Sequence, residues 1–130
     1  MADAELDFSA LLDEIEHIGY DAEEIARKAY PLVKEHAKQV EKEWRANARK
    51  TARRHGRHYP NSITSEQIFN TSGPEWEIGP DSAKKQGSMG KGFEYGSVKQ
   101  PPHLDGARAT QKIEPEFNAA VDKLVKEFLA

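Results

Sequence analysis

The stretch DAEEIARKAYPLVKEHAKQVEKEWRANARKTARRHG, residues 21–56, decides the fold. It opens on Asp21 with Glu24 three positions later, a pattern typical of a helix capping box. Small and apolar residues then recur every three or four positions, the period of one buried helical face: Ile25, Ala29, Leu32, Val33, Ala37, Val40, Trp44 and Ala48. The sequence therefore predicts a long helix over 21–56, with a kink or a split at Pro31 because proline removes a helical hydrogen bond.

An acidic segment precedes this helix. Residues 1–24 contain nine aspartates and glutamates and no lysine or arginine. Apolar residues again follow a helical spacing, at Phe8, Leu11, Leu12, Ile15 and Ile18. We therefore predict an acidic N-terminal helical extension over residues 1–20.

The period changes after Pro60. Residues 62–69 can form a strand with Ile63 and Phe69 on one face, and residues 75–79 alternate polar and apolar side chains. Residues 70–74 between them are a turn cluster, so the two runs predict a β-hairpin. Residues 80–91 are rich in glycine, serine and lysine, and we expect a flexible loop inside a β-sheet region spanning 60–98.

A second amphipathic helix is predicted over 114–130, with Pro115 in its first turn. The stretch 98–106, with its Pro-Pro pair, is expected to be neither helix nor central strand. Together these elements predict one α+β domain over residues 1–130. In it, a long N-terminal helix and a C-terminal helix pack on a small, mainly antiparallel sheet.

The composition narrows the class of protein. With 130 residues, 37% of them hydrophobic and 32% charged, the chain predicts a thin core that gains stability by packing against other subunits. It has no cysteine, which excludes disulfides, thiolate metal sites and a cysteine nucleophile. The acidic N-terminus does not resemble a signal peptide, and no stretch approaches the roughly 20 apolar residues of a membrane span. We expect a protein that is soluble when made and binds no membrane.

Basic residues are concentrated where the long helix ends. Residues 42–58 contain seven bases and a single acid, Glu43. Arg45, Arg49 and Arg53 recur at four-residue spacing and share one helical face. The predicted basic face consists of Arg45, Arg49, Lys50, Arg53, Arg54 and Arg57. Such a row can neutralise phosphates without reading bases, or pair with acids on a neighbouring subunit.

No group of residues predicts catalysis. His55 and His58 stand among arginines, which disfavours a metal ion there. The glycine-rich stretch 87–92 lacks the spacing of a phosphate-binding loop. We therefore predict no catalytic, cofactor-binding or metal-binding residue, and no enzyme. Trp76, Phe93 and Tyr95 are candidates for contacts between subunits, because aromatic residues are enriched at interface centres.

Short motifs from residue 22 to the end of the chain resemble a known family in their order and spacing. They are Tyr59-Pro60-Asn61-Ser62-Ile63, Trp76-Glu77-Ile78-Gly79, Phe93-Glu94-Tyr95-Gly96, Pro101-Pro102-His103-Leu104, Asp105-Gly106-Ala107 and the closing helix from Phe117 to Leu129. This pattern resembles the neck or tail-completion proteins of long-tailed, non-contractile bacteriophages, also described as minor tail components or head-tail connectors.

The resemblance implies a structural virion protein without enzymatic activity or cofactor, made in the host cytoplasm and incorporated into the neck or tail. It implies copies that form a ring, a hexamer or a dodecamer, around the channel for genomic DNA. A head connector or stopper protein would lie on one side and a tail terminator protein on the other. In such a ring, the basic face would border the lumen, contacting DNA without sequence preference, or meet the acidic N-terminal block of the adjacent subunit.

Two other functions fit parts of the sequence. A tail terminator, which caps the tail tube, is close in class and differs in position. A small nucleic-acid-binding regulator would use the arginine-rich helix end, although the net charge of -3 disfavours a freestanding DNA-binding domain.

Overall fold

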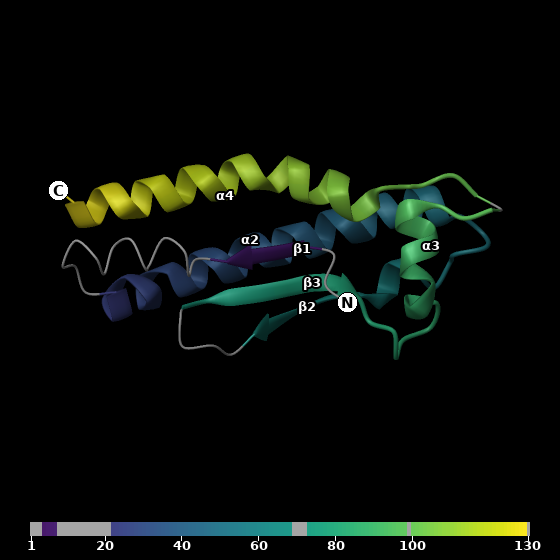
Figure 1. Ribbon diagram of the computed structural model, residues 1–130, viewed down its shortest axis with the longest axis horizontal. Coiled ribbons are helices and arrows are strands. Elements are labelled where there is room, and N and C mark those ends of the chain that lie inside the picture. The colour runs from purple at the N-terminus through teal and green to yellow at the C-terminus, as the bar shows by residue number, and fades with distance from the viewer. Residues whose placement is uncertain (1–3, 8–21, 69–72, 99, 130) are drawn as a thin grey trace.

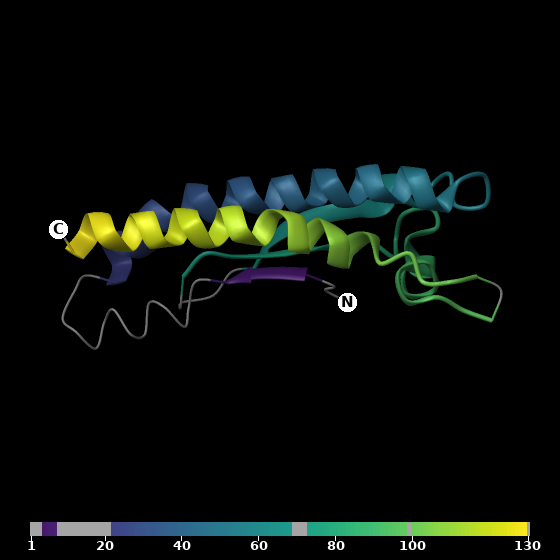
Figure 2. The same ribbon diagram turned by 90° about the horizontal axis from the view of Figure 1, so that it is seen from above.

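The computed structural model describes residues 4–7, 22–68, 73–98 and 100–129. Its elements in chain order are β1 (Ala4–Asp7), α2 (Ala22–Ala52), the 3-10 turn η1 (Pro60–Ser62), β2 (Ile63–Ile68), β3 (Glu75–Pro80), the 3-10 turn η2 (Gly87–Met89), α3 (Gly90–Tyr95) and α4 (Asp105–Leu129). The long helices α2 and α4 lie side by side and run in opposite directions (Figure 1). A three-stranded antiparallel sheet packs against α2, and the view in Figure 2 shows the elongated body that results. The α+β prediction is confirmed.

The long helix forms around the apolar stripe that the sequence predicts. Ile25, Ala29, Val33, Ala37, Val40, Trp44, Ala48 and Ala52 are all buried, at spacings of three and four residues. Alanine at half of these positions lets α2 approach its neighbours closely. Pro31 lies inside the helix without splitting it, so the predicted split does not occur. The proline is exposed, and burial of the stripe on the other side outweighs the missing hydrogen bond.

The predicted hairpin is confirmed and gains a third strand. β2 and β3 pair antiparallel, with Ile63 opposite Pro80 and Ile68 opposite Glu75. β1 pairs with the other edge of β3, giving the order β1-β3-β2. The prediction of a helix over residues 1–20 is therefore wrong for Ala4–Asp7, where alternating apolar and polar residues suit the open edge of β3. The remaining residues of that predicted helix, 1–3 and 8–20, lie outside the described part.

The chain between β3 and α4 is more structured than predicted. The expected loop over 80–91 contains η2, and α3 begins at Gly90, so the β-sheet region ends well before residue 98. A Cβ atom on Gly87 would lie 1.8 Å from the backbone oxygen of Asp81, so only glycine permits this turn. The two buried glycines pack against backbone atoms and side chains of other segments. Composition alone does not reveal these contacts, so it indicated a loop.

The C-terminal helix begins earlier than predicted. α4 starts at Asp105 rather than at residue 114, and Pro115 lies in its interior rather than in its first turn. The proline faces solvent, while Ile113, Phe117 and Leu124 are buried. The Pro-Pro pair had suggested that 98–106 is neither helix nor central strand, which is wrong for Asp105 and Gly106. A side chain from a distant segment starts the helix instead, as described below.

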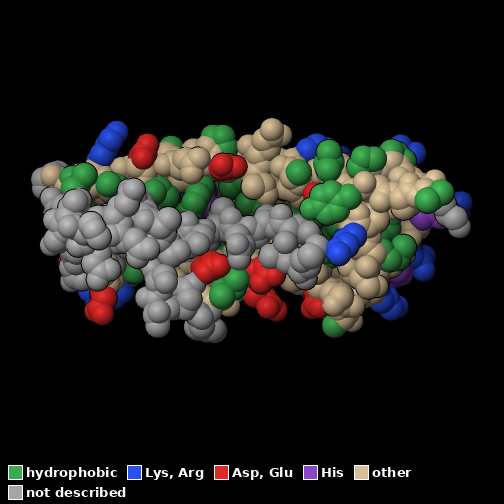
Figure 3. Space-filling view, in the orientation of Figure 1, with side chains coloured by type: hydrophobic (Ala, Val, Ile, Leu, Met, Phe, Trp, Pro, Cys, Tyr) green, Lys and Arg blue, Asp and Glu red, His purple; other side chains and the backbone are tan. Residues whose placement is uncertain are grey.

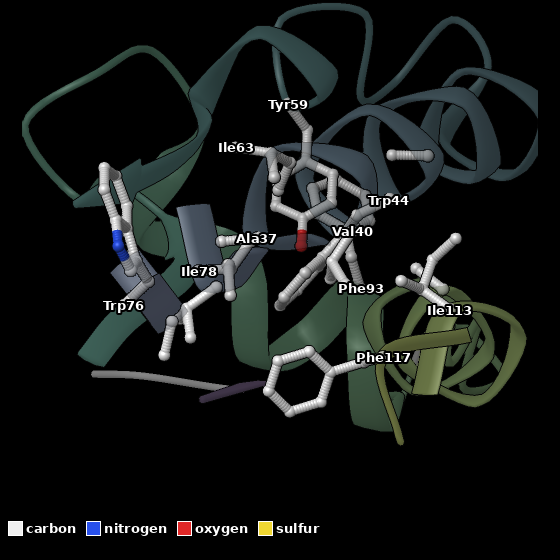
Figure 4. Close-up of a cluster of buried hydrophobic side chains, with 14 of the residues drawn as sticks. Ala37, Val40, Trp44, Tyr59, Ile63, Trp76, Ile78, Phe93, Ile113 and Phe117 are labelled. Atoms are coloured by element: carbon white, nitrogen blue, oxygen red, sulfur yellow. The ribbon is translucent and has the colours of Figure 1, made fainter. Parts of the chain in front are cut away.

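Trp44 is at the centre of the core. Its side chain is fully buried, and Figure 4 shows it close to Val40, Tyr59 and Phe93. The rings of Tyr59 and Phe93 pack with their centroids 4.5 Å apart. The core thus joins α2, the segment after it and α3, with Ile63 and Ile78 of the sheet on the other side.

Candidate functional site

The end of α2 is a defined turn. Arg53 has a positive φ of 48°, which stops the helix, and the N–H of Gly56 then donates to the carbonyl of Ala52 over 2.9 Å. A Cβ atom on Gly56 would lie 2.5 Å from the Ala52 side chain and 2.9 Å from the Phe93 ring. Glycine at this position therefore lets the chain turn back tightly against the core.

Gln86 fixes this turn from the opposite segment. Its side-chain amide donates to the carbonyl of His55 over 2.6 Å, and its Oε1 accepts the backbone N–H of His58 over 2.8 Å. Gln86 itself has a positive φ of 62°, which presents the side chain to the turn. The residues after α2 are consequently held in place by the segment before α3, and the basic side chains that they carry project from a fixed backbone.

Five of the six residues of the predicted basic face lie exposed on this turn and the helix before it. We call this group the basic end; it consists of Arg49, Lys50, Arg53, Arg54 and Arg57. Among the described residues, none of these five lies within 4.0 Å of a carboxylate oxygen. Nε of Arg57 lies 3.2 Å from Nε2 of the neighbouring His58. The structure thus brings together a group of cations that form no salt bridge with the carboxylates of the described residues.

Arg45 does not belong to this group. Its Nε donates to the backbone carbonyl of Ile63 over 2.8 Å, and its guanidinium lies 3.4 Å from Glu41. Arg45 therefore anchors the start of β2 to the middle of α2. Helical spacing alone placed it with Arg49 and Arg53, because the position of the sheet over α2 is a property of the tertiary fold.

Replacing Arg45 and Arg49 separately by alanine distinguishes these roles. We expect Arg45→Ala to lower the free energy of unfolding by about 1 kcal/mol, because a charge-assisted hydrogen bond at a partly exposed site is lost. Arg49→Ala removes an exposed cation and should change stability by less than about 0.5 kcal/mol. Urea denaturation of both variants measures the difference; equal losses would contradict the anchoring role of Arg45.

The three aromatic residues predicted to lie between subunits differ in their exposure to solvent. Phe93 and Trp76 are buried in the chain's own core, at 2% and 6% exposure, whereas Tyr95 is 57% exposed. Trp76 lies beside Tyr30 on α2, and Phe93 stacks between Tyr59 and His103. Of the three, Tyr95 is the one that keeps a substantial surface for a neighbour.

A buried carboxylate starts α4. Glu94 is 2% exposed, and its two oxygens accept the backbone N–H groups of Gly106 and Ala107, each over 2.9 Å. These N–H groups belong to the first turn of α4 and have no partner within the helix. The carboxylate thus acts as an N-cap supplied by α3, and it also suits the positive end of the helix dipole.

Asp105 ties the same turn to α2. It is wholly buried; Oγ1 of Thr51 lies 2.9 Å from both carboxylate oxygens, and the guanidinium of Arg108 lies 2.8 Å from one of them. The amide of Asn47 donates to the backbone oxygen of Asp105 over 3.0 Å. These polar contacts join the last turns of α2 to the start of α4, a place we call the α2–α4 junction.

The outer face of the sheet carries a group that the sequence analysis missed. Trp76 and Ile78 of β3 are buried against α2, so Glu77 between them faces away, directly opposite Glu66 of β2. An open hollow lies here, which we call the acidic hollow; it is lined by Thr64, Glu66, Glu77, Gly79, Pro80, Asp81 and Ser82. Figure 3 shows acidic side chains below the centre of this face, where Figure 1 draws β2 and β3, and basic ones toward the end where α2 stops. The alternation of residues 75–79 held the signal, because it separates Glu77 from the core.

Histidines and acids do not gather into a metal site in the described ranges 4–7, 22–68, 73–98 and 100–129, where no group of three or more His, Asp or Glu residues is arranged to hold an ion. His55 is exposed, and His58 contacts Arg57 and Gln86. The site that the described residues build is thus a pair of oppositely charged surfaces.

No helix in the described part of the chain combines the length and the apolar character that crossing a membrane requires. Comparisons with known protein families, with curated proteins and with solved structures found no match.

Proposed function

We propose that this chain is a non-enzymatic structural subunit of a bacteriophage neck. Copies of it form a ring, a hexamer or a dodecamer, that joins the head connector to the tail and surrounds the DNA channel. The subunit is made in the host cytoplasm and becomes part of the virion. Its neighbours are a connector or stopper protein on the head side and a tail terminator protein on the tail side.

One observation carries this proposal: four of the six motifs behind the family resemblance contact one another at a single place. Glu94 of Phe93-Glu94-Tyr95-Gly96 caps the helix that begins in Asp105-Gly106-Ala107. Tyr59 packs on Phe93, and Phe93 stacks on His103. Motifs with a shared structural role are expected to recur together in one family, which supports treating the resemblance as more than a set of unrelated short matches.

The distribution of charge also supports an assembly role. The basic end has no carboxylate within 4.0 Å among the described residues, and the acidic hollow is a separate surface on the sheet. Separated surfaces of opposite sign suit a subunit that binds charged neighbours. The five cations would border the DNA lumen or lie against the adjacent subunit.

A cryo-electron-microscopy map of the phage particle tests this proposal. We expect a ring of this chain between the connector and the tail. An infection without the protein should produce filled heads and unattached tails of normal length. Abnormally long tails would indicate a tail terminator instead, and salt-dependent binding of free DNA by the monomer, with no place in the particle, would indicate a nucleic-acid-binding regulator.

Charge reversal at the basic end should block head-tail joining without unfolding the subunit. We expect Arg49→Glu combined with Arg53→Glu to reduce infectious particles at least about tenfold, since like-charge contacts at an interface cost several kcal/mol. Plaque counts and electron microscopy of the particles measure the effect, and thermal melting checks the fold.

The matched control reverses two exposed cations in the first half of α2, Arg27→Glu with Lys34→Glu. It changes the net charge by the same amount away from the basic end. Normal infectivity of the Arg49 and Arg53 variant, or an equal loss in the control, would contradict the role of this surface.

A further inference from the structure

The acidic hollow places like charges close together. Glu66 and Glu77 stand directly opposite each other on neighbouring strands, and Asp81 lines the same hollow. Like charges at directly opposed positions of a sheet destabilise the pair. The backbone register also sets Glu5 of β1 opposite Glu77, which adds a third glutamate position to the same row across the sheet.

No cation of the described residues relieves this arrangement. Ion pairs join Lys28, Lys38, Arg45, Arg108 and Lys112 to acids elsewhere, and within the described part of the chain none involves Glu66, Glu77 or Asp81. Lys84 and Lys85 follow the hollow in sequence, yet both are exposed and make no ion pair with another described residue. The hollow is therefore suited to a cation from another molecule.

The basic end has the complementary chemistry. Its side chains are exposed, and Gln86 holds the backbone of the turn in place, so binding has to order the side chains but not that backbone. Arginine suits the task because its planar guanidinium can bind two carboxylate oxygens at once. The two surfaces are formed by different residues, so one copy can offer its basic end to the hollow of the next.

We propose that the acidic hollow of one copy receives the basic end of a second copy, with Arg54 and Arg57 entering beside Glu66 and Glu77. Such a contact joins two different surfaces, and repetition of a contact of this kind closes into a ring when the rotation between copies allows it. The inference rests on the proposed function in taking the ring as the assembled state. It assigns the basic end to the neighbouring subunit rather than to DNA.

A charge exchange across the contact provides the test, by sedimentation velocity of the purified chain at low ionic strength, where screening is weakest. One variant carries Glu66→Lys and Glu77→Lys; the other carries Arg54→Glu and Arg57→Glu. Each alone should weaken self-association at least about tenfold. An equal mixture of the two should restore it, since each altered surface then meets its complement, and so should a single chain carrying all four substitutions.

The control for the hollow is Glu114→Lys with Glu116→Lys, the same change of charge on exposed positions of α4. It should leave self-association unchanged. A mixture that fails to restore association, a control that weakens it equally, or a wild-type chain that stays monomeric under these conditions would overturn the proposal. So would duplex DNA binding that requires Arg54 and Arg57 while both reversals leave self-association intact.

The outcome separates this inference from the proposed function. If the charge exchange restores self-association but this chain is absent from the phage neck, the contact is supported and the proposed function is rejected. If this chain forms a ring in the neck, but the charge exchange does not restore self-association in solution and another surface lies against the hollow, the proposed function is supported and the contact is rejected.

Discussion

Replacing Gly106 by alanine should lower the free energy of unfolding by about 1–3 kcal/mol, the range for overpacking a well-packed core. Alanine normally stabilises a helix relative to glycine by about 1 kcal/mol. Here a Cβ atom would lie 2.6–2.7 Å from three carbons of the Trp44 indole ring. Trp44 is fully buried between the helices and cannot move aside without disturbing the core. Thermal and urea denaturation would measure the loss.

Gly92 provides the matched control. It lies in α3, and a Cβ atom there would have its nearest neighbour, the side-chain amide of Gln100, at an ordinary 3.7 Å. Gly92→Ala should therefore be neutral or slightly stabilising. If alanine were tolerated equally well at Gly106, the close approach of α4 to Trp44 described here would be incorrect.

Replacing Glu94 by alanine should destabilise the fold by about 3 kcal/mol, because a buried N–H left without an acceptor costs about 1–3 kcal/mol and the loss of a part-buried hydrogen bond adds to this. The affected groups are the backbone N–H groups of Gly106 and Ala107 at the start of α4. The first turn of α4 should also lose protection in amide hydrogen exchange, while the centre of α2 keeps more of it. Denaturation and hydrogen exchange together measure the effect.

Two further variants test whether the loss of the Glu94 cap causes this destabilisation. Glu94→Gln keeps the shape and one acceptor oxygen, so we expect a smaller loss than with alanine. Glu116→Ala removes a carboxylate from an exposed position of α4 and should be close to neutral. A Glu94→Ala protein as stable as the wild type would show that the cap contributes nothing.

The elements that follow from local sequence were predictable. The stripe from Ile25 to Ala48 indicates α2, and the alternation of residues 75–79 after a turn cluster indicates the β2–β3 hairpin. The start of α4 was not predictable in the same way, because its cap comes from Glu94, which is distant along the chain. β1 was missed for a related reason: four residues pair with an edge that exists only once the hairpin has formed.

The candidate site was likewise predictable only where it depends on local sequence. Basic residues at the end of α2 were recognised from composition, and five of the six predicted residues are exposed there. Arg45 was misplaced because its partner, the Ile63 carbonyl, belongs to a strand 18 positions away. The acidic hollow required the pairing of Glu66 with Glu77, and strand register does not follow from either strand alone.

The pairing of β1 with β3 has a practical consequence for handling the protein. A shortened chain beginning at α2 would leave the β3 edge with unsatisfied backbone donors and acceptors in place of β1. Bare edges of this kind recruit strands from other molecules and promote aggregation. The four residues of β1 therefore cover this edge of β3 and leave a shorter edge strand in its place, and a purification tag is better attached at the C-terminal end.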